Sequence, residues 1–245
     1  MTKYRISIGA IAIFLAIPII ASTAAAADEY AGIRKVGVIS AIGDSFHVSK
    51  VGFTVFGNSG YTFPISAWGL DAIVAQQVTD AIKNRFAVKP IAADPSPIEQ
   101  TKDGEDLGTF VRSLPAGNAV DAYVVVYKFR CSEQCAGTPF ALSGLGLAHH
   151  DGLFGHQDNL LYAFYGVAVV DAKNGKTIDY GTGNLGGGVL GLNMPYAEAD
   201  ASVWAEALDA LQPSQKETLK AEMIGLIQQS LSNALTNAKL TANGL

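Results

Sequence analysis

The chain is poor in the residues on which catalytic and metal sites most often rely. Its 245 residues include four histidines, two cysteines and two tryptophans, and 16% of them are charged. The formal net charge is −5, and the lysines and arginines are scattered along the chain. This pattern lacks the basic patch that binds a nucleic-acid backbone, so we expect no nucleic acid among the partners.

The amino terminus carries the longest uncharged run of the chain. Lys3 and Arg5 precede a run that ends in three alanines before Asp28. This order predicts a secretory signal peptide over residues 1–27. The alternative is an uncleaved anchor, because the run reaches the roughly 20 residues that a membrane span needs, although Pro18 and the alanines weigh against it. The cut also lacks a nearby cysteine, so a lipid-modified amino terminus is not expected.

Cleavage would leave residues 28–245 as one domain, in the periplasm or secreted, with no stable membrane span. Loss of Lys3 and Arg5 takes the formal net charge from −5 to −7. An oxidising compartment favours a disulfide between the two cysteines, Cys131 and Cys135. Three residues separate them, which does not match a Cys-x-x-Cys redox pair, and two thiolates alone would leave a metal site incomplete.

Periodicity and turn residues predict strands in the first part of the chain and around residue 170. We expect one hairpin across the turn Ile42–Ser45, a strong strand over Ala119–Phe129, and a second hairpin over Leu160–Gly181. In the second hairpin Asn174-Gly175 favours a type I′ turn, in which both central residues have positive φ. The first arm of this hairpin is apolar on both alternating sets, which indicates a strand covered on both faces.

Apolar residues at helical spacing predict the covering helices. The expected ranges are 66–85, with Ser66 as the N-cap, then 105–114, 196–211 and 214–240. Residues 130–159 are expected to form a long loop that carries both cysteines and three of the four histidines. These elements predict the α/β class, as a single sandwich-like domain whose mixed, mainly antiparallel sheet is covered by helices and whose carboxyl end is helical.

Ser45 is the candidate nucleophile. Gly43-Asp44-Ser45-Phe46, after an expected strand, resembles the amino-terminal block of the GDSL or SGNH hydrolases, in which the serine attacks an ester. That chemistry requires a general base, which the family supplies as Asp-x-x-His near the carboxyl terminus. The sequence has no Asp-x-x-His and no histidine after His156. A β-turn therefore explains the motif better than an esterase.

Two further motifs have chemical and structural interpretations. His149, His150 and His156, with nearby aspartates, are candidate ligands for zinc or copper, but their spacing matches no known ligand pattern, which favours solvated loop histidines. Gly181–Gly186 matches Gly-x-Gly-x-x-Gly, yet the glycines and Pro195 that follow would disrupt the helix that a dinucleotide needs. We expect a glycine loop there, and no cofactor.

The order of elements resembles a group of bacterial envelope proteins. The resemblance rests on three segments: VGVIS in the first strand, Asp121 at the start of the strand DAYVV, and a strand that ends in VDAKNGK. The group includes the curli-secretion lipoprotein, the penicillin-binding-protein activator lipoproteins and the amino-terminal domain of the Tol-system periplasmic protein. The resemblance implies an α/β interaction or assembly module with an envelope protein as partner. A non-enzymatic module is thus the expected function, and an esterase using Ser45 is the alternative.

Overall fold

The computed structural model describes residues 29–52, 54–91, 93–99, 106–115, 119–131, 142–151, 157–186, 194–205 and 210–241. The predicted leader, residues 1–27, lies outside this part of the chain, so its cleavage remains a prediction. Within the described residues, no helix combines the length and the apolar character needed to cross a membrane.

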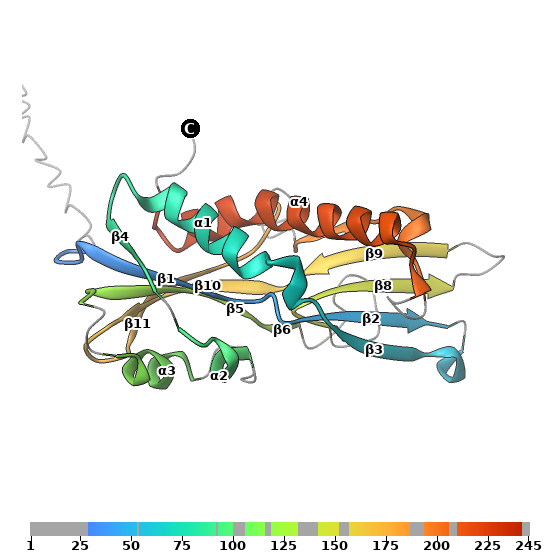
Figure 1. The fold of residues 1–245 in the computed structure, drawn as a ribbon, viewed down its shortest axis with the longest axis horizontal. Helices are drawn as coiled ribbons and strands as arrows, with labels where there is room; N and C mark the ends of the chain where they lie inside the picture. The colour runs from blue at the N-terminus through green and yellow to red at the C-terminus, as the bar shows by residue number, and fades with distance from the viewer. Residues whose placement is uncertain are drawn as a thin grey trace, which may run out of the picture.

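Sheet A has five strands in the order β11-β10-β5-β1-β4 (Figure 1). β1 runs parallel to β4 and β5, while β10 is antiparallel to both β5 and β11. The β-branched run of β5 is buried along most of its length, because helices cover both faces of this sheet. The strands are β1 (Lys35–Ala41), β4 (Ala87–Pro90), β5 (Ala122–Lys128), β10 (Tyr165–Asp171) and β11 (Thr177–Thr182).

Sheet B also has five strands, in the order β12-β9-β8-β2-β3. β2 is parallel to β8 and antiparallel to β3, and β9 is antiparallel to β8 and β12. A small third pair, β6 (Arg130–Cys131) with β7 (Leu142–Ser143), follows β5. The strands of sheet B are β2 (Ser45–Val51), β3 (Ser59–Pro64), β8 (Leu145–Asp151), β9 (Gln157–Ala163) and β12 (Tyr196–Glu198).

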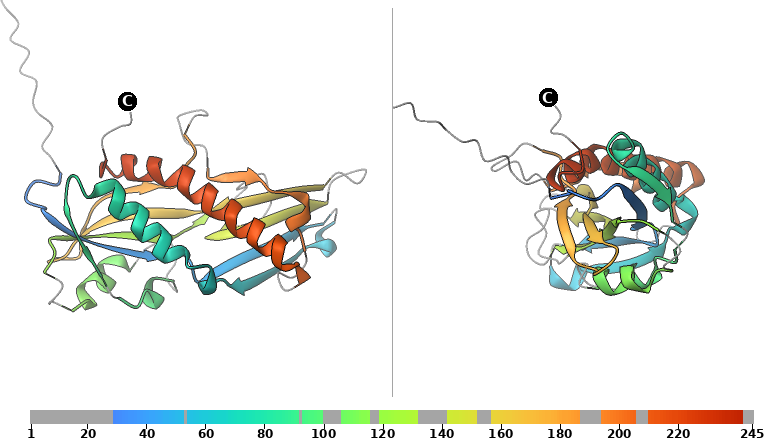
Figure 2. Two further views of the ribbon diagram at one scale, coloured as in Figure 1. Left: turned by 45° about the horizontal axis from the view of Figure 1, so that its top comes forward. Right: turned by 90° about the vertical axis from the view of Figure 1, so that its left-hand side faces the viewer.

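Helices form a layer over one side of both sheets. α1 (Leu70–Ile82) packs on β1, and α4 (Pro213–Asn237) packs on β9, β10 and β11, which Figure 2 shows from two further directions. On the other side of sheet A lie α2 (Ser96–Glu99) and α3 (Leu107–Ser113). The predicted α/β class is confirmed, with helices over mixed, mainly antiparallel strands and a helical carboxyl end.

The apolar stripes of α1 and α4 explain why these helices form. In α1 the buried residues recur every fourth position, as Leu70, Val74, Val78 and Ile82. The predicted stripe of α4 is buried throughout, and Pro213 begins the helix, where its missing N–H is tolerated. Ser66 is not the N-cap of α1: it begins a 3₁₀ turn, η2 (Ser66–Trp68), and Gly69, at φ 67°, caps the helix instead.

The predicted first hairpin is wrong. β1 and β2 do not pair, because the chain passes through Ile42, Gly43 and Asp44 from sheet A into sheet B. β1 finds its neighbours in β4 and β5, and β2 finds its own in β3 and β8. The turn residues mark the place where the chain changes sheets rather than where it folds back.

The second hairpin is confirmed for β10 and β11, with two corrections. Its expected first arm is two strands, because the chain leaves sheet B at the end of β9, passes Phe164 and enters sheet A. The turn is also not type I′, since Gly175, at φ 70°, has positive φ but Asn174 does not. Instead Asp171 Oδ1 accepts hydrogen bonds from the amides of Lys173 (2.8 Å) and Asn174 (2.9 Å).

Two other expectations also fail. Residues 130–159 are not one loop, because β8 lies inside sheet B between β2 and β9, and β9 begins at residue 157. Residues 196–211 are not one helix: β12 is followed by a 3₁₀ turn, η7 (Ala201–Val203), in which Asp200 Oδ1 accepts the amide of Ser202. The indole of Trp204 then stacks on the ring of His149 at 4.0 Å.

Candidate functional site

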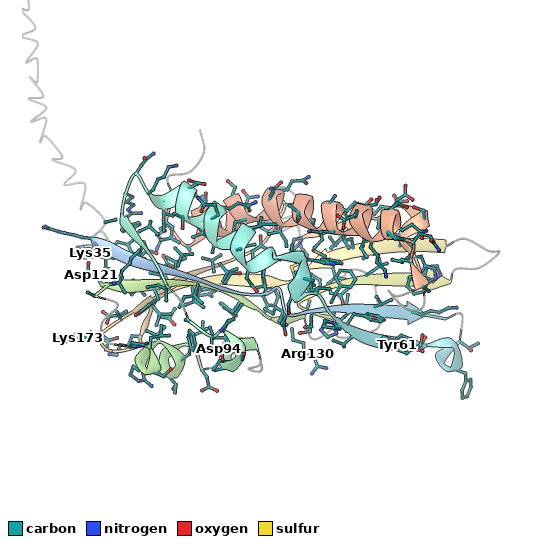
Figure 3. The ribbon with its side chains drawn as sticks, in the orientation of Figure 1. Lys35, Tyr61, Asp94, Asp121, Arg130 and Lys173 are labelled. Atoms are coloured by element: carbon teal, nitrogen blue, oxygen red, sulfur yellow. The ribbon has the colours of Figure 1, made fainter. Side chains whose placement is uncertain are left out.

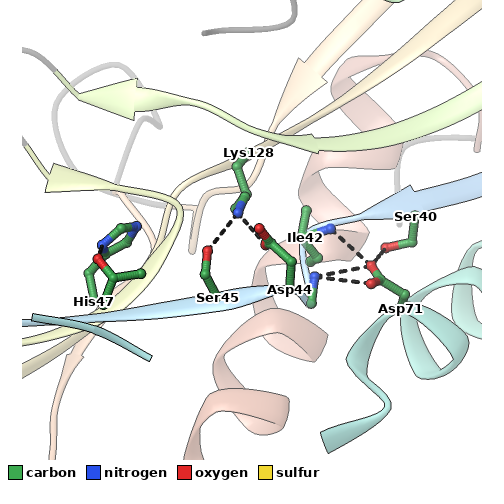
Figure 4. Close-up of polar contacts among 9 residues, drawn as sticks. Ser40, Ile42, Asp44, Ser45, His47, Asp71 and Lys128 are labelled. Atoms are coloured by element: carbon green, nitrogen blue, oxygen red, sulfur yellow. Dashed lines mark hydrogen bonds and ion pairs between the residues drawn. The ribbon is translucent and has the colours of Figure 1, made fainter. Parts of the chain in front are cut away.

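The predicted nucleophile lies where the two sheets meet, beside a lysine that the sequence analysis did not single out. Ser45 begins β2, and its Oγ accepts a hydrogen bond from Lys128 Nζ at 2.9 Å (Figure 4). Lys128 ends β5 and forms an ion pair with Asp44. The lysine side chain is only 11% exposed and the aspartate 27%. We call Asp44, Ser45 and Lys128 the junction cluster.

Asp71 fixes the backbone at this junction from the first turn of α1. Its Oδ1 accepts hydrogen bonds from Ser40 Oγ at 2.6 Å and from the amide of Ile42 at 2.9 Å (Figure 4). The amide of Gly43 donates to both carboxylate oxygens at 3.2 Å. A side chain at Gly43 would stand 2.8 Å from the Asp71 carboxylate, which explains the glycine. Asp71 therefore holds the crossing between sheets in place.

Glycine also gives the lysine its route to the junction. Gly144 has φ 61°, and a Cβ there would lie 2.6 Å from Cδ of Lys128. Next to Lys128, backbone hydrogen bonds join three segments of the chain. The Phe129 amide donates to the Phe164 carbonyl, the Phe164 amide to the Gly144 carbonyl, and the Gly144 amide to the Phe129 carbonyl. The position of Lys128 is thus set by the close approach of Gly144 and by the backbone hydrogen bonds of the neighbouring Phe129.

His47 is the histidine nearest to Ser45 along β2, but it has a different partner. Its Nδ1 is hydrogen-bonded to Thr62 Oγ1 on β3 at 2.8 Å, and no hydrogen bond joins it to Ser45 (Figure 4). Burial, followed by the nearby Lys128 ammonium, lowers the pKa of His47, while Asp44 acts weakly in the opposite direction. His47 is therefore a half-buried side chain that links β2 to β3.

Two of the other histidines lie far from Ser45 in sheet B. His149 and His150 are paired in register with Lys50 and Val51, about 15–20 Å along β2 from the serine. His156 lies outside the described residues. Because the lysine that contacts Ser45 is in an ion pair with Asp44, its ammonium has no free lone pair to accept the serine proton. The geometry of the junction cluster is that of a structural ion pair with a hydroxyl partner.

Of the predicted metal cluster, His149 and His150 are described and do not share a face of the sheet, whereas His156 lies outside the described residues. His149 and His150 are neighbours on β8, so the alternation of the strand places them on opposite faces of sheet B. His149 is buried, not solvated as expected, and its Nδ1 is bonded to Asn159 Oδ1 at 2.7 Å. Among the described residues, no group of three His, Cys, Asp or Glu side chains is arranged to hold a metal.

The glycine motif is explained by packing. A Cβ on Gly181 would lie 2.1 Å from the Ala234 carbonyl of α4, and one on Gly183 would lie 2.7 Å from the Tyr165 ring. Gly186, the third glycine of the motif, has φ 69°, and Asn184 Oδ1 accepts its amide at 3.1 Å. Gly181 lies in β11 against α4, and the described residues of the motif, up to Gly186, are not helical.

The predicted disulfide cannot be followed to both ends. Cys131 lies in β6, which pairs with β7, whereas Cys135 lies outside the described residues. The Cys131–Cys135 disulfide therefore remains a prediction.

Asp121, which carries part of the envelope-protein resemblance, has a structural role. Its Oδ2 accepts the amides of Arg34 at 2.9 Å and Lys35 at 2.8 Å, so it ties the start of β1 to the start of β5 (Figure 3). These two hydrogen bonds lower the pKa of the carboxyl group. Asp121 consequently helps to fix the register of the parallel pair.

A surface of a different kind lies at one edge of sheet B, where no described strand pairs with the outer side of β3. β3 is its last strand, and a short 3₁₀ turn, η1 (Val55–Gly57), precedes it. Phe56 is 95% exposed and Tyr61 51% exposed, and Figure 3 shows Tyr61 on this outer strand. We call η1 and β3 together the β3 edge.

Comparisons with known proteins add no relative to this description. No protein-family model matches the chain, and no curated protein is significantly similar to it. What the structure defines is a class, an α/β protein of two mixed sheets, and its function must be argued from its own residues.

Proposed function

We propose that this protein is a non-enzymatic binding module of the bacterial cell envelope, periplasmic or secreted, which holds an envelope protein partner at the β3 edge. The observation that carries the proposal is the exposure of Phe56 and Tyr61 beside an unpaired strand. Large aromatic side chains supply much of the binding energy of interfaces, and an unpaired strand offers backbone hydrogen bonds. The leader and the resemblance to envelope modules support the compartment.

The junction cluster supports the non-enzymatic part of this proposal. Its lysine is engaged by Asp44, and none of the described histidines is hydrogen-bonded to Ser45. A serine without a base is a weak nucleophile. The cluster instead connects β2 to β5, which gives the β3 edge a rigid support.

Site-specific photocrosslinking in intact cells tests the proposal. A benzophenone amino acid would replace Phe56 or Tyr61, and a matched control would carry it at Glu217, an exposed position on α4. We expect a discrete covalent adduct from the two β3-edge positions and none from Glu217. No adduct from any position, or equal adducts from all three, would contradict the proposal.

A second candidate function is an esterase that uses Ser45. One observation favours it: Lys128 Nζ lies 2.9 Å from Ser45 Oγ, so a lysine that lost its proton could act as the base. A fluorophosphonate probe should then label the protein, and Ser45→Ala should abolish both labelling and the release of nitrophenol from short acyl esters. Absence of any label on the wild-type chain would remove this candidate.

A further inference from the structure

The four edge strands of the two sheets differ in charge. β4, β11 and β12 each carry a charged side chain, namely Lys89, Asp179 and Glu198. β3 carries none, and neither does the whole stretch from residue 52 to residue 65. Charged side chains on an edge strand hinder pairing with another chain, so their absence from β3 removes a barrier that the other three edges keep.

The hydrogen-bond phase of β3 determines which backbone groups face outward. The Ile65 amide donates to the Asp44 carbonyl at 2.9 Å, and β2 and β3 continue from this pair in antiparallel register. Because bonded and non-bonded pairs alternate, Tyr61 and Phe63 bond inward to β2, whereas Gly60 and Thr62 direct their amide and carbonyl groups to the free edge. Pro64 is also in an outward position, where its missing N–H costs sheet B nothing.

We infer that the β3 edge pairs antiparallel with the β3 edge of a second copy of this chain. One register pairs all the outward amide and carbonyl groups of Gly60 and Thr62. In it, Gly60 faces Thr62 of the second copy, and Thr62 faces Gly60 of the second copy. Each of these is a narrow pair with two N–H···O bonds. Tyr61 then lies on the twofold axis, opposite the Tyr61 side chain of the second copy, and the pairing covers a ring that is 51% exposed in one chain.

The occupant is a second copy because this edge is complementary to itself. Without its predicted leader the chain has a formal net charge of −7, which opposes association of its copies in general, whereas the uncharged β3 edge adds no repulsion where two copies meet. Head-to-tail pairing of β3 with β12 would place Glu198 inside a continuous sheet, which is unfavourable. The twofold arrangement uses both β3 edges and closes on itself, so it gives a dimer and not a filament.

This inference rests on the proposed binding function, since it names the partner at the same edge. The test is the mass of the full chain, purified from an exporting host, measured by sedimentation equilibrium against concentration. Gly60→Pro removes an outward N–H without touching a bond to β2, and the space beside Gly60 is open, the nearest atom to a Cβ being the Val48 carbonyl oxygen at 3.8 Å. Gly60→Ala is the matched control, because it keeps that N–H.

We expect wild type and Gly60→Ala to dimerise, and Gly60→Pro to raise the dimer dissociation constant by about tenfold or more, because two hydrogen bonds are lost per dimer. Unchanged circular dichroism of Gly60→Pro would show that the fold is intact; if it changes, Thr62→Lys replaces it, with the same expected loss. A monomeric wild type, or equal dimerisation of all variants, overturns the inference.

The crosslinking experiment separates this failure from that of the binding function. A monomeric protein that still gives a Tyr61 adduct with a different protein retains the binding function but not self-pairing. A monomer that gives no adduct loses both.

Discussion

Adding a single methyl group at Gly181 should disrupt the contact between the carboxyl-terminal end of α4 and β11 in sheet A. In Gly181→Ala the new Cβ would lie 2.1 Å from the Ala234 carbonyl oxygen and 2.9 Å from the Ala238 amide nitrogen. Both atoms belong to backbone, so neither can rotate away as a flexible side chain would. The carboxyl-terminal end of α4 must therefore move off β11, or β11 must bend away from it.

The expected loss follows from that overlap. Overpacking a buried contact costs about 1–3 kcal/mol, and a rigid backbone partner places this variant near the upper end, about 3 kcal/mol. For a chain of this size each kcal/mol lowers the midpoint of thermal unfolding by about 2–4 °C, so a fall of about 6–12 °C is expected.

Gly225→Ala provides the matched control on the same helix. A Cβ at Gly225 meets nothing within 4 Å, so the change only improves helix propensity, by about 0.5–1 kcal/mol. Its midpoint should rise by about 1–4 °C. Differential scanning calorimetry of the three proteins at one pH measures both shifts. A Gly181→Ala protein as stable as wild type, or two variants that are equally destabilised, would refute the packing argument.

Three further predictions concern the junction and the cysteines. Asp71→Ala leaves two backbone amides without an acceptor and should lower the free energy of unfolding, measured in urea, by about 2–4 kcal/mol. Asp71→Asn should lower it less. Equal stability of Asp71→Ala and wild type would contradict the role given to this carboxylate. Burial and Lys128 lower the pKa of His47 in the folded chain below the ordinary value of 6.5. Between the two pKa values the unfolded chain therefore binds more protons than the folded chain, so the free energy of unfolding should fall as the pH drops from 6.5 towards the lowered folded pKa. His47→Gln should flatten that decline, and an unchanged profile would count against it. For Cys131 and Cys135, iodoacetamide should add mass only after reduction; labelling without reductant would exclude the disulfide.

Elements with strong local signals could be predicted from the sequence. Three patterns each specify one element and its buried face: the β-branched run of β5, the apolar residues at every fourth position of α1, and the long apolar stripe of α4. The α/β class follows from these elements alone. What the signals do not contain is the partner of each strand, because pairing depends on residues far away in the chain.

The division into two sheets shows this limit most clearly. Gly43 and Asp44 indicate a turn whether the chain folds back or crosses to another sheet, and the deciding contacts come from Asp71, in α1. Phe164, where β9 gives way to β10, is apolar like its neighbours and gives no signal of a break. The local sequence at each crossing is compatible with both outcomes.

Glycine was the most misleading residue type. Gly144 and Gly146 fall within the loop expected over residues 130–159, yet Gly144 directly precedes β8 and Gly146 lies inside it. A Cβ on Gly146 would lie 2.2 Å from the Tyr162 hydroxyl oxygen, because that ring lies across β8. In the candidate site, Ser45 was found from its motif but Lys128 was not, although it is the only charged residue in β5 and that signal was present in the sequence.

The pairing of distant segments has a consequence for the timing of folding. Val36 lies beside Ala122 in β5, and Ser49 beside Ala148 in β8, so both parallel pairs close loops of roughly a hundred residues. α4, near the carboxyl end, then has to cover strands from both sheets. Such a topology assembles slowly and cannot be completed until nearly the whole chain is present. Slow completion of the fold is compatible with the export that the predicted leader implies.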